Sequence, residues 1–256
     1  MTREIVCSFA ELDAVGDALR LDVRRFPFTI GHHGVTVEER ISLITAVHRD
    51  LVARDLVRGN DFAPELVEQL HLFAQAPLTI AVVGAIRDAP LVALAATDGR
   101  SGVLAVQRDE AVAFHRHSPD TVVRALLGLL PELRPGPGSP VVVTTPAPRA
   151  PDEDFSQFRF TSGMRPAATA DSLAAEIVRR PRLGAGYFTA TARHGRREAE
   201  LGTISYLDTD AGRYAVLPGT GPDGRPTATY TPADRWSLER MLTRLTSEFG
   251  GGAGTA

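Results

Sequence analysis

The segment AGYFTATARHGRREAELGTISYLD, residues 185–208, consists of two strand-like runs joined by the turn Gly195-Arg196-Arg197. Two further strand-like runs follow at 213–217 and 227–230, after turns rich in glycine. The sequence Thr231-Pro232-Ala233-Asp234 then predicts a helix start, because it offers a hydroxyl at the N-cap, proline at the first helical position and a carboxylate in the first turn. The segment therefore predicts four short strands closed by one helix.

An earlier part of the chain, Leu78 to Leu130, repeats this plan. Its strand-like runs lie at 78–86, 91–97, 102–107 and 111–117. They lead into Ser118-Pro119-Asp120, which predicts a helix start of the same chemical kind. Each copy also follows a helical run, at 63–74 and at 169–180. Two such copies fit one sheet with pseudo-two-fold symmetry better than a solenoid, which needs three or more repeats.

The repeat predicts an α+β fold organised as a single domain with two halves. The expected divisions are a domain over 1–248, repeat halves at about 63–130 and 169–248, a linker at 131–165 and a flexible tail at 249–256. Proline and glycine clusters break up the linker, in which Val141 to Thr144 is the one short strand-like run.

Composition points to a reducing compartment. An apolar content of 43% and a mean hydropathy of −0.05 are ordinary for a soluble globular protein. No run reads as a membrane span, and the start of the chain does not resemble a signal peptide. The single cysteine, Cys7, excludes an internal disulfide and is expected to be a buried small hydrophobe on a first strand. We therefore expect a cytoplasmic protein without membrane insertion.

The charge pattern argues against nucleic acid as the main partner. All 28 basic residues are arginine, and the net charge is −3, whereas nucleic-acid binding normally requires a basic surface. The basic turn Arg193 to Arg197 keeps a nucleic-acid module as the least favoured alternative. A solvated hairpin tip explains these arginines more simply.

Two capping boxes predict helices in the N-terminal region. Ser8 with Glu11 opens a short helix, and Thr36 with Glu39 opens the longest helix of the chain, which we expect to run to about Arg58 and to end at Gly59-Asn60. The apolar residues expected to pack one face of this long helix are Val37, Ile41, Ile44, Leu51 and Val52.

No motif assembles a catalytic or metal site. Gly219 to Gly224 matches the dinucleotide fingerprint in letters, but it carries Pro222 and leads into a strand, so a hairpin loop is expected. His115 and His117 share a strand face without a third ligand nearby, and the His32-His33 pair also lacks one. We expect no enzyme activity, no cofactor and no bound metal.

An enzyme or a small-ligand-binding protein stays open as the alternative. The strands of the second half alternate more than those of the first, which indicates that one sheet face is open there. Tyr187, Thr189, Thr191 and Thr203 lie on these strands and are candidates to line a pocket.

Several motifs, in their order along nearly the whole chain, resemble the EspG family of ESX (type VII) secretion-associated proteins of actinobacteria. In the first half they are Ser8-Phe9-Ala10-Glu11-Leu12, the stretch His33 to Arg40, and Leu51 to Leu56. In the second half they are Gly184-Ala185-Gly186-Tyr187-Phe188, Asp208 to Tyr214, and Thr231-Pro232-Ala233-Asp234.

The resemblance implies a central, mostly antiparallel β-sheet flanked by two helical bundles. It implies a cytosolic chaperone without catalytic activity, which binds PE/PPE-type substrates of type VII secretion and keeps them soluble for export. The first long hairpin loop of the sheet and the C-terminal helical bundle are the implied contact surface. The residues that this assigns here are Arg87, Asp88, Arg179, Arg180, Arg240 and Arg244. Another small type VII substrate is an alternative partner, and a weak homodimer through an exposed strand edge also stays open.

Overall fold

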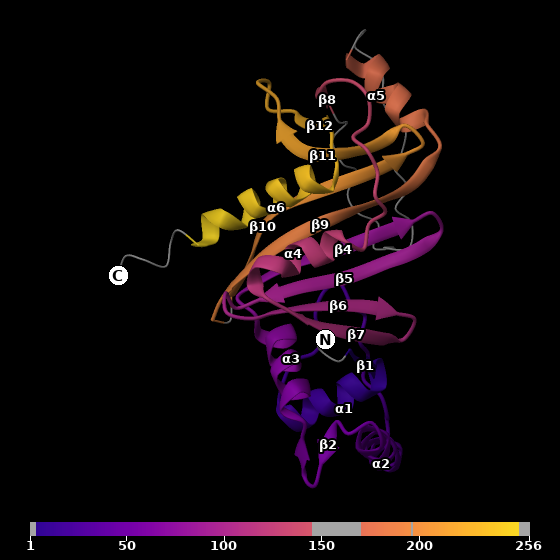
Figure 1. Cartoon of the computed structure of the whole chain (residues 1–256), viewed down its shortest axis with the longest axis vertical. Helices are drawn as coiled ribbons and strands as arrows, with labels where there is room; N and C mark the ends of the chain where they lie inside the picture. The colour runs from indigo at the N-terminus through magenta and orange to yellow at the C-terminus, as the bar shows by residue number, and fades with distance from the viewer. Residues whose placement is uncertain (1–3, 145–169, 196, 251–256) are drawn as a thin grey trace.

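The computed structural model describes residues 4–144, 170–195 and 197–250, and its strands form one ten-stranded antiparallel sheet (Figure 1). In spatial order the strands are β1 (Ile5–Ser8), β7 (Ala111–His117), β6 (Gly102–Arg108), β5 (Ala89–Thr97), β4 (Leu78–Ile86), β9 (Arg182–His194), β10 (Arg197–Thr209), β11 (Gly212–Thr220), β12 (Pro226–Pro232) and β8 (Val141–Thr144). A separate hairpin consists of β2 (Val57–Arg58) and β3 (Asp61–Phe62). The helices are α1 (Phe9–Leu19), α2 (Val37–Ala53), α3 (Pro64–Gln75), α4 (Pro119–Leu127), α5 (Ala170–Arg179) and α6 (Arg235–Gly250).

The strand order confirms the predicted pseudo-two-fold repeat. β4 and β9 pair at the centre, and the strands then match outward as β5 with β10, β6 with β11, β7 with β12 and β1 with β8. Helices α3 and α5 precede the two central strands, and α4 and α6 follow β7 and β12. The two copies therefore build one continuous sheet, with α1, α2 and α3 at one end and α5 at the other (Figure 1).

Each face of the sheet has its own helices. On the α4/α6 face, Val82, Phe188 and Ile204 pack with Leu126 and Leu238 in one buried cluster. The two helices also contact each other, since Arg124 Nη2 lies 3.0 Å from Glu239 Oε1. On the α3/α5 face, one cluster lies under α1 and α3 and another lies beside α5.

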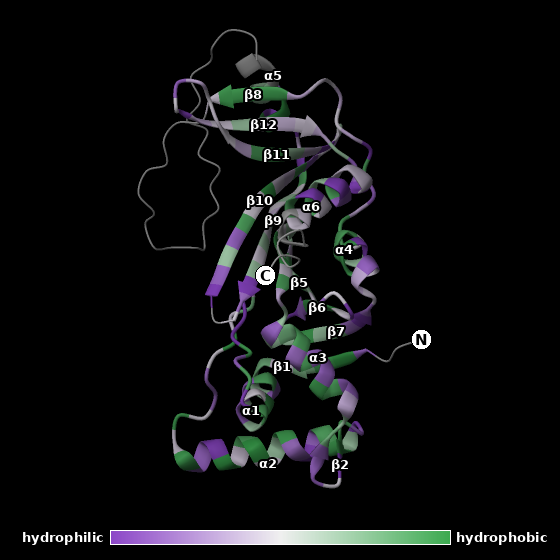
Figure 2. Ribbon diagram, turned by 90° about the vertical axis from the view of Figure 1, so that its left-hand side faces the viewer, coloured by the Kyte–Doolittle hydropathy of each residue, from purple (hydrophilic) through white to green (hydrophobic). Residues whose placement is uncertain are grey.

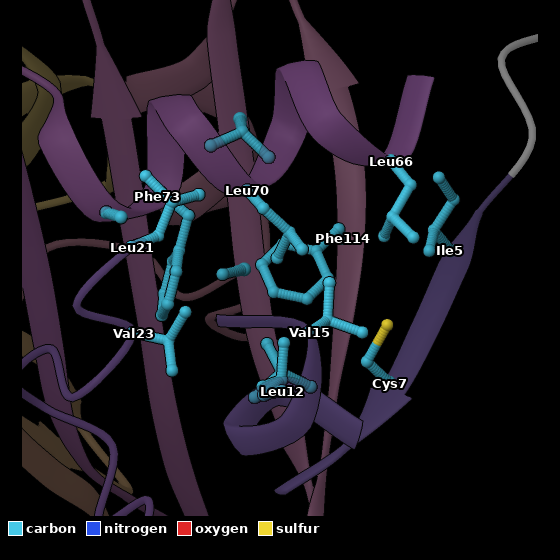
Figure 3. Close-up of a cluster of buried hydrophobic side chains, with 14 of the residues drawn as sticks. Ile5, Cys7, Leu12, Val15, Leu21, Val23, Leu66, Leu70, Phe73 and Phe114 are labelled. Atoms are coloured by element: carbon cyan, nitrogen blue, oxygen red, sulfur yellow. The ribbon is translucent and has the colours of Figure 1, made fainter. Parts of the chain in front are cut away.

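Aromatic and aliphatic side chains fill the N-terminal core on the α3/α5 face (Figure 3). The Phe73 ring packs edge-on against Phe114, with 5.3 Å between the ring centroids. Cys7 lies in the same core, as predicted, with 1% of its surface exposed. Burial raises the pKa of its thiol to about 12, so the thiol stays protonated at neutral pH and is a poor nucleophile.

The helix starts in the N-terminal region follow the capping chemistry. Both predicted boxes are present, Ser8 with Glu11 on α1 and Thr36 with Glu39 on α2. Pro119 opens α4 as predicted, but the Ser118 hydroxyl bonds the Thr121 hydroxyl at 2.9 Å and caps no backbone N–H.

The long helix differs from its prediction in two respects. It ends at Ala53 because Asp55 adopts a left-handed φ of 58° and Leu56 N–H bonds back to Leu51 O at 2.8 Å, a Schellman-type end. Gly59-Asn60 instead forms the turn between β2 and β3.

The predicted packing face of the long helix is also wrong. Val47 and Leu51 are buried, whereas most of the predicted stripe is exposed: Val37, Ile41, Ile44 and Val52.

The last helix starts later than its motif predicts. β12 continues through Thr231 and Pro232, which pair with β11, so Thr231 is not the N-cap. α6 begins at Arg235, and Asp234 Oδ1 accepts a hydrogen bond from Ser237 N–H at 2.7 Å. The Asp234 carboxylate is thus the N-cap group of α6, because Thr231 and Pro232 are engaged in strand pairing.

The first part of the predicted linker is held against the second half of the sheet. Gly136 N–H bonds Arg213 O at 2.8 Å, and the Tyr214 hydroxyl donates to Pro137 O at 2.9 Å. The linker's one predicted strand is β8, the edge strand beside β12. The rest of the linker, 145–165, and the tail from 251 lie outside the described residues. Within the described residues, no helix combines the length and apolarity needed to span a bilayer.

Candidate functional site

The centre of the α3/α5 face carries no helix among the described residues. Figure 2 views the sheet nearly edge-on, with α4 and α6 on one side, α1 to α3 below and α5 above. The helices of the α3/α5 face thus stand at the two ends of the sheet, and no helix in the described part of the chain covers β4, β9 and β10 between them.

A hollow of about 660 Å³ occupies this uncovered centre, and we call it the central hollow. Its lining residues are Val83, Gly84, Ala85, Arg87, Asp88, Pro90, Val92, Arg182, Gly184, Ala185, Gly186, Tyr187 and Ser205. Strand register explains its apolar floor, because Val83 pairs with both Val92 and Tyr187 and all three side chains share one face. Both halves of the repeat therefore contribute to it.

The turn between β4 and β5 forms one wall of the central hollow. Ile86 pairs with Ala89, so Arg87 and Asp88 are the two turn residues. Arg87 adopts a left-handed φ of 54°, and its N–H donates to Leu183 O on β9 at 2.6 Å. This hydrogen bond connects the turn to the other half of the sheet. It thereby positions the backbone of Arg87 and Asp88 at the wall of the hollow.

The β9 and β10 strands add a polar stretch beyond the floor. The Thr189 and Thr203 hydroxyls lie 3.0 Å apart, and Thr203 donates to Glu200 Oε1 at 2.8 Å. Burial, assisted by the Glu200 charge, raises the pKa of Tyr187. Of the four residues named for the alternative pocket, only Tyr187 lines the hollow, while Thr189 and Thr203 bond each other and Thr191 pairs opposite Glu200.

The structure separates the predicted partner-binding residues into two groups. Arg87 and Asp88 line the central hollow, and Arg179 and Arg180 lie just before Arg182, which also lines it. Arg180 forms two ion pairs, with 3.2 Å between its Nη2 and Glu176 Oε1 and 3.7 Å between its Nη1 and Asp210 Oδ1. Arg179 is exposed.

Arg240 and Arg244 form the second group, on α6, which packs on the opposite face of the sheet. Arg240 stacks on the exposed Trp236 ring, with its guanidinium carbon 3.8 Å from the ring centroid. One compact partner surface on the α3/α5 face therefore cannot include these two arginines.

The central hollow combines an apolar floor with a few polar groups. Its charged residues are Arg87, Asp88 and Arg182, and its phenol, Tyr187, is held in the protonated form. No group of three or more metal-ligand side chains occurs within the described residues. The loop Gly219 to Gly224, predicted to be a hairpin loop despite its fingerprint letters, does join β11 to β12, with Gly221 N–H bonded to Arg225 O at 2.8 Å.

The sequence alone did not identify Val83, Val92 and Ser205 as site residues. Each looks like ordinary strand sequence, and only the pairing of β4 with β9 brings them to one uncovered face. The one usable signal was the alternating pattern of the second half, which led to Tyr187.

Comparisons with known proteins agree with this architecture. A solved structure of similar fold is that of the Mycobacterium tuberculosis type VII secretion system chaperone EspG5 in complex with a PE25–PPE41 dimer, with a TM-score of 0.63, 11% identity and coverage of 96% of each chain. No curated protein matches the sequence. The EspG family model matches residues 8–244, which confirms the resemblance found in the sequence. The chain belongs to the EspG family.

Proposed function

We propose that this chain is a cytosolic chaperone that binds PE/PPE-type substrates of type VII secretion in the central hollow and keeps them soluble for export. The observation that carries the proposal is a largely apolar hollow on the central strands of an EspG-family sheet, which no described helix covers. The similar EspG5 structure contains a PE25–PPE41 dimer, which supports the choice of substrate class.

The physical role of the hollow is to mask apolar surface. An exposed apolar tip on a secreted protein drives aggregation, and covering it removes that driving force. Val83, Val92 and Tyr187 supply an apolar and aromatic centre, and Arg87, Asp88 and Arg182 supply a polar rim. An apolar centre with a polar, arginine-containing rim is typical of protein interfaces that form and dissociate. Binding of this kind needs no catalytic step.

Arg179 and Arg180 extend the proposed rim toward α5. A second recess adjoins the hollow there and is lined in part by Val178, Arg182 and Ser205. Arg180 is already paired within the chain, so the exposed Arg179 is the better candidate for a contact with an acidic group of the substrate.

Co-expression with a PE–PPE pair from the same genome tests the proposal. We expect a stable complex and more soluble substrate with the natural chain, and a loss of both with Val92→Arg, which places a charge on the apolar floor. Val142→Arg is the matched control, because Val142 is 56% exposed on the edge strand β8 and lies outside the hollow. Failure of the natural chain to form a complex, or equal loss with both variants, would contradict the proposal.

The size of the hollow also favours a second candidate, a small-ligand site. A volume of about 660 Å³ lies in the range of ligand pockets. Thermal-shift screening with metabolites, repeated on Val92→Arg, tests this candidate. A ligand that stabilises only the natural chain would support it, and a screen without such a ligand would count against it.

A further inference from the structure

Helix α2 is packed along only part of its circumference. Val47 and Leu51 are buried against the core, and the Arg40 guanidinium bonds both Asp13 and Asp17 on α1. The other apolar side chains face solvent, with exposed fractions of 71% for Val37, 60% for Ile41, 49% for Ile44 and 47% for Val52. Figure 2 shows α2 at the end of the molecule, beyond α1 and far from the centre of the sheet.

The four exposed apolar residues and the exposed His48 form a single stripe, which we call the α2 stripe: Val37, Ile41, Ile44, His48 and Val52. At about 100° per residue, these positions fall within a sector of about 80°. Steps of three and four residues are the spacing by which one helix packs along another. An apolar stripe at this spacing, with no partner among the described residues, therefore has the form of half of a helix–helix interface.

The charges beside the α2 stripe indicate which partner would complete it. Glu38 and Arg49 lie on the same flank, eleven residues or about three turns apart. Neither forms an ion pair within the described residues, whereas the carboxylate of the neighbouring Glu39 accepts from Thr36 N–H and Asp50 pairs with Arg54. One end of this flank is thus acidic and the other basic, and both charges are available to a partner.

We propose that a second copy of this chain docks on the α2 stripe, with the two α2 helices antiparallel about a two-fold axis close to Ile44. In such a pair the same flank of both helices meets in reverse order, so Glu38 lies beside Arg49 of the partner subunit, and the pairing occurs twice. Ile44 then packs against its own symmetry mate, and Val37 packs near Val52 of the partner subunit. A self-complementary flank favours a second copy over an unrelated helix, which would need a matching charge order by coincidence.

The dimer would leave the central hollow free. α2 lies at one end of the molecule, and the hollow lies on β4, β5, β9 and β10 at its centre (Figure 1). The α2 interface is therefore independent of the proposed function, and a substrate that binds in the hollow need not displace the second copy. With one helix from each copy, the interface is small, so we expect a dimer that dissociates on dilution.

Sedimentation velocity over a range of protein concentrations tests the interface. The natural chain should show a monomer–dimer equilibrium, and Ile44→Arg should weaken it by about tenfold or more, because two like charges would meet on the axis. Ala46→Arg is the matched control, since Ala46 is exposed on α2 about 160° from the middle of the α2 stripe and should leave the equilibrium unchanged. A natural chain that stays monomeric up to about 1 mM, the Kd of a complex worth only about 4 kcal/mol, or a dimer that tolerates Ile44→Arg, would overturn the proposal.

A charge exchange tests the antiparallel arrangement itself. Glu38→Arg gives a flank with two arginines, and Arg49→Glu gives one with two acids, so each variant alone should dimerise less than the natural chain. Mixed together, the two should form a heterodimer, which native mass spectrometry separates from either homodimer by mass. Unfolding curves for each variant check that both are folded. Homodimers that persist unchanged, or a mixture without heterodimer, would contradict the antiparallel pairing.

Discussion

Gly84 of β4 lies directly opposite Gly186 of β9, at the point where the two halves of the sheet pair. The Tyr206 ring lies over both glycines on the α4/α6 face. A Cβ on Gly84 would clash with Ala185 O and would stand 2.7 Å from the Tyr206 hydroxyl oxygen. A Cβ on Gly186 would stand 2.5 Å from Val83 O and 2.8 Å from Tyr206 Cε1. The absence of side chains at both positions lets one aromatic ring cover the junction of the two repeats.

We therefore expect Gly84→Ala and Gly186→Ala each to lower the free energy of unfolding by about 1–3 kcal/mol through overpacking. Urea denaturation followed by circular dichroism measures the change. Gly31→Ala is the control, because nothing lies within 4 Å of a Cβ at Gly31, and it should be close to neutral. An unchanged free energy of unfolding in both Gly84→Ala and Gly186→Ala would contradict the prediction of overpacking.

Asp13 joins α1 to α2 and to the irregular segment between them. Its buried carboxylate accepts hydrogen bonds from Arg24, Arg40 and the His33 N–H. Burial alone would raise its pKa, but the His33 hydrogen bond and the two arginine charges outweigh it and hold the pKa of Asp13 below its usual value. A lowered folded-state pKa stabilises the protein above the unfolded-state pKa of about 3.9, and this stabilisation is lost as the pH falls through the folded-state value.

Asp13→Asn should accordingly lower the free energy of unfolding at pH 7 by about 3–5 kcal/mol. The difference from the natural chain should begin to shrink below about pH 4, the unfolded-state pKa, and should disappear below the lowered folded-state pKa of Asp13, where the natural carboxylate is also protonated. Denaturation curves at a series of pH values measure both effects. Asp61→Asn, on the exposed end of β3, serves as the control and should show neither.

Asp208 and Arg213 form a fully buried ion pair in the second half. Arg213 Nε and Nη2 lie 2.6 and 2.8 Å from the two carboxylate oxygens of Asp208. Asp208→Ala should cost about 3–5 kcal/mol because it leaves a buried guanidinium without its partner, and replacing both residues with leucine should recover much of the loss. In the exposed pair of Asp223 and Arg225, the change Asp223→Ala should cost less than about 1 kcal/mol. Equal costs at the two sites would contradict this account.

Arg87 offers a change with opposite effects on stability and binding. Its left-handed φ of 54° is unfavourable for any residue with a side chain, so Arg87→Gly should raise the free energy of unfolding by up to about 1 kcal/mol. The same change removes a rim side chain and should weaken substrate binding in a titration. Arg100→Gly changes an exposed turn position without a positive φ. It should not raise the free energy of unfolding and should leave substrate binding unchanged. Loss of stability in Arg87→Gly would contradict the strain argument.

The sequence predicted those features of the fold that depend on local chemistry. The bounds of β4 and β7 and the two capping boxes follow from turn residues, alternation and hydroxyl–carboxylate spacing within a few residues. The repeat itself also predicted the pseudo-two-fold sheet, because the same order of elements occurs twice.

Tertiary contacts decided the features that the sequence did not predict. The α2 stripe has the spacing of a packed face, and only the structure shows that α2 turns its Val47 side inward instead. Thr231 and Pro232 have the chemistry of a helix start, but pairing with β11 keeps them in β12. The central hollow depends on the pairing of β4 with β9, two strands about 100 residues apart along the chain. No local sequence pattern therefore predicts it.

Site-specific photo-cross-linking tests the central claim, that secretion substrates dock in the central hollow. Photo-reactive benzoylphenylalanine would replace Tyr187 in the hollow, Ile44 on α2 or Arg240 on α6, in separate samples mixed with a PE–PPE pair. We expect a covalent product with the substrate from position 187 and none from position 44 or 240. Cross-links from position 240 or 44, with none from position 187, would contradict it.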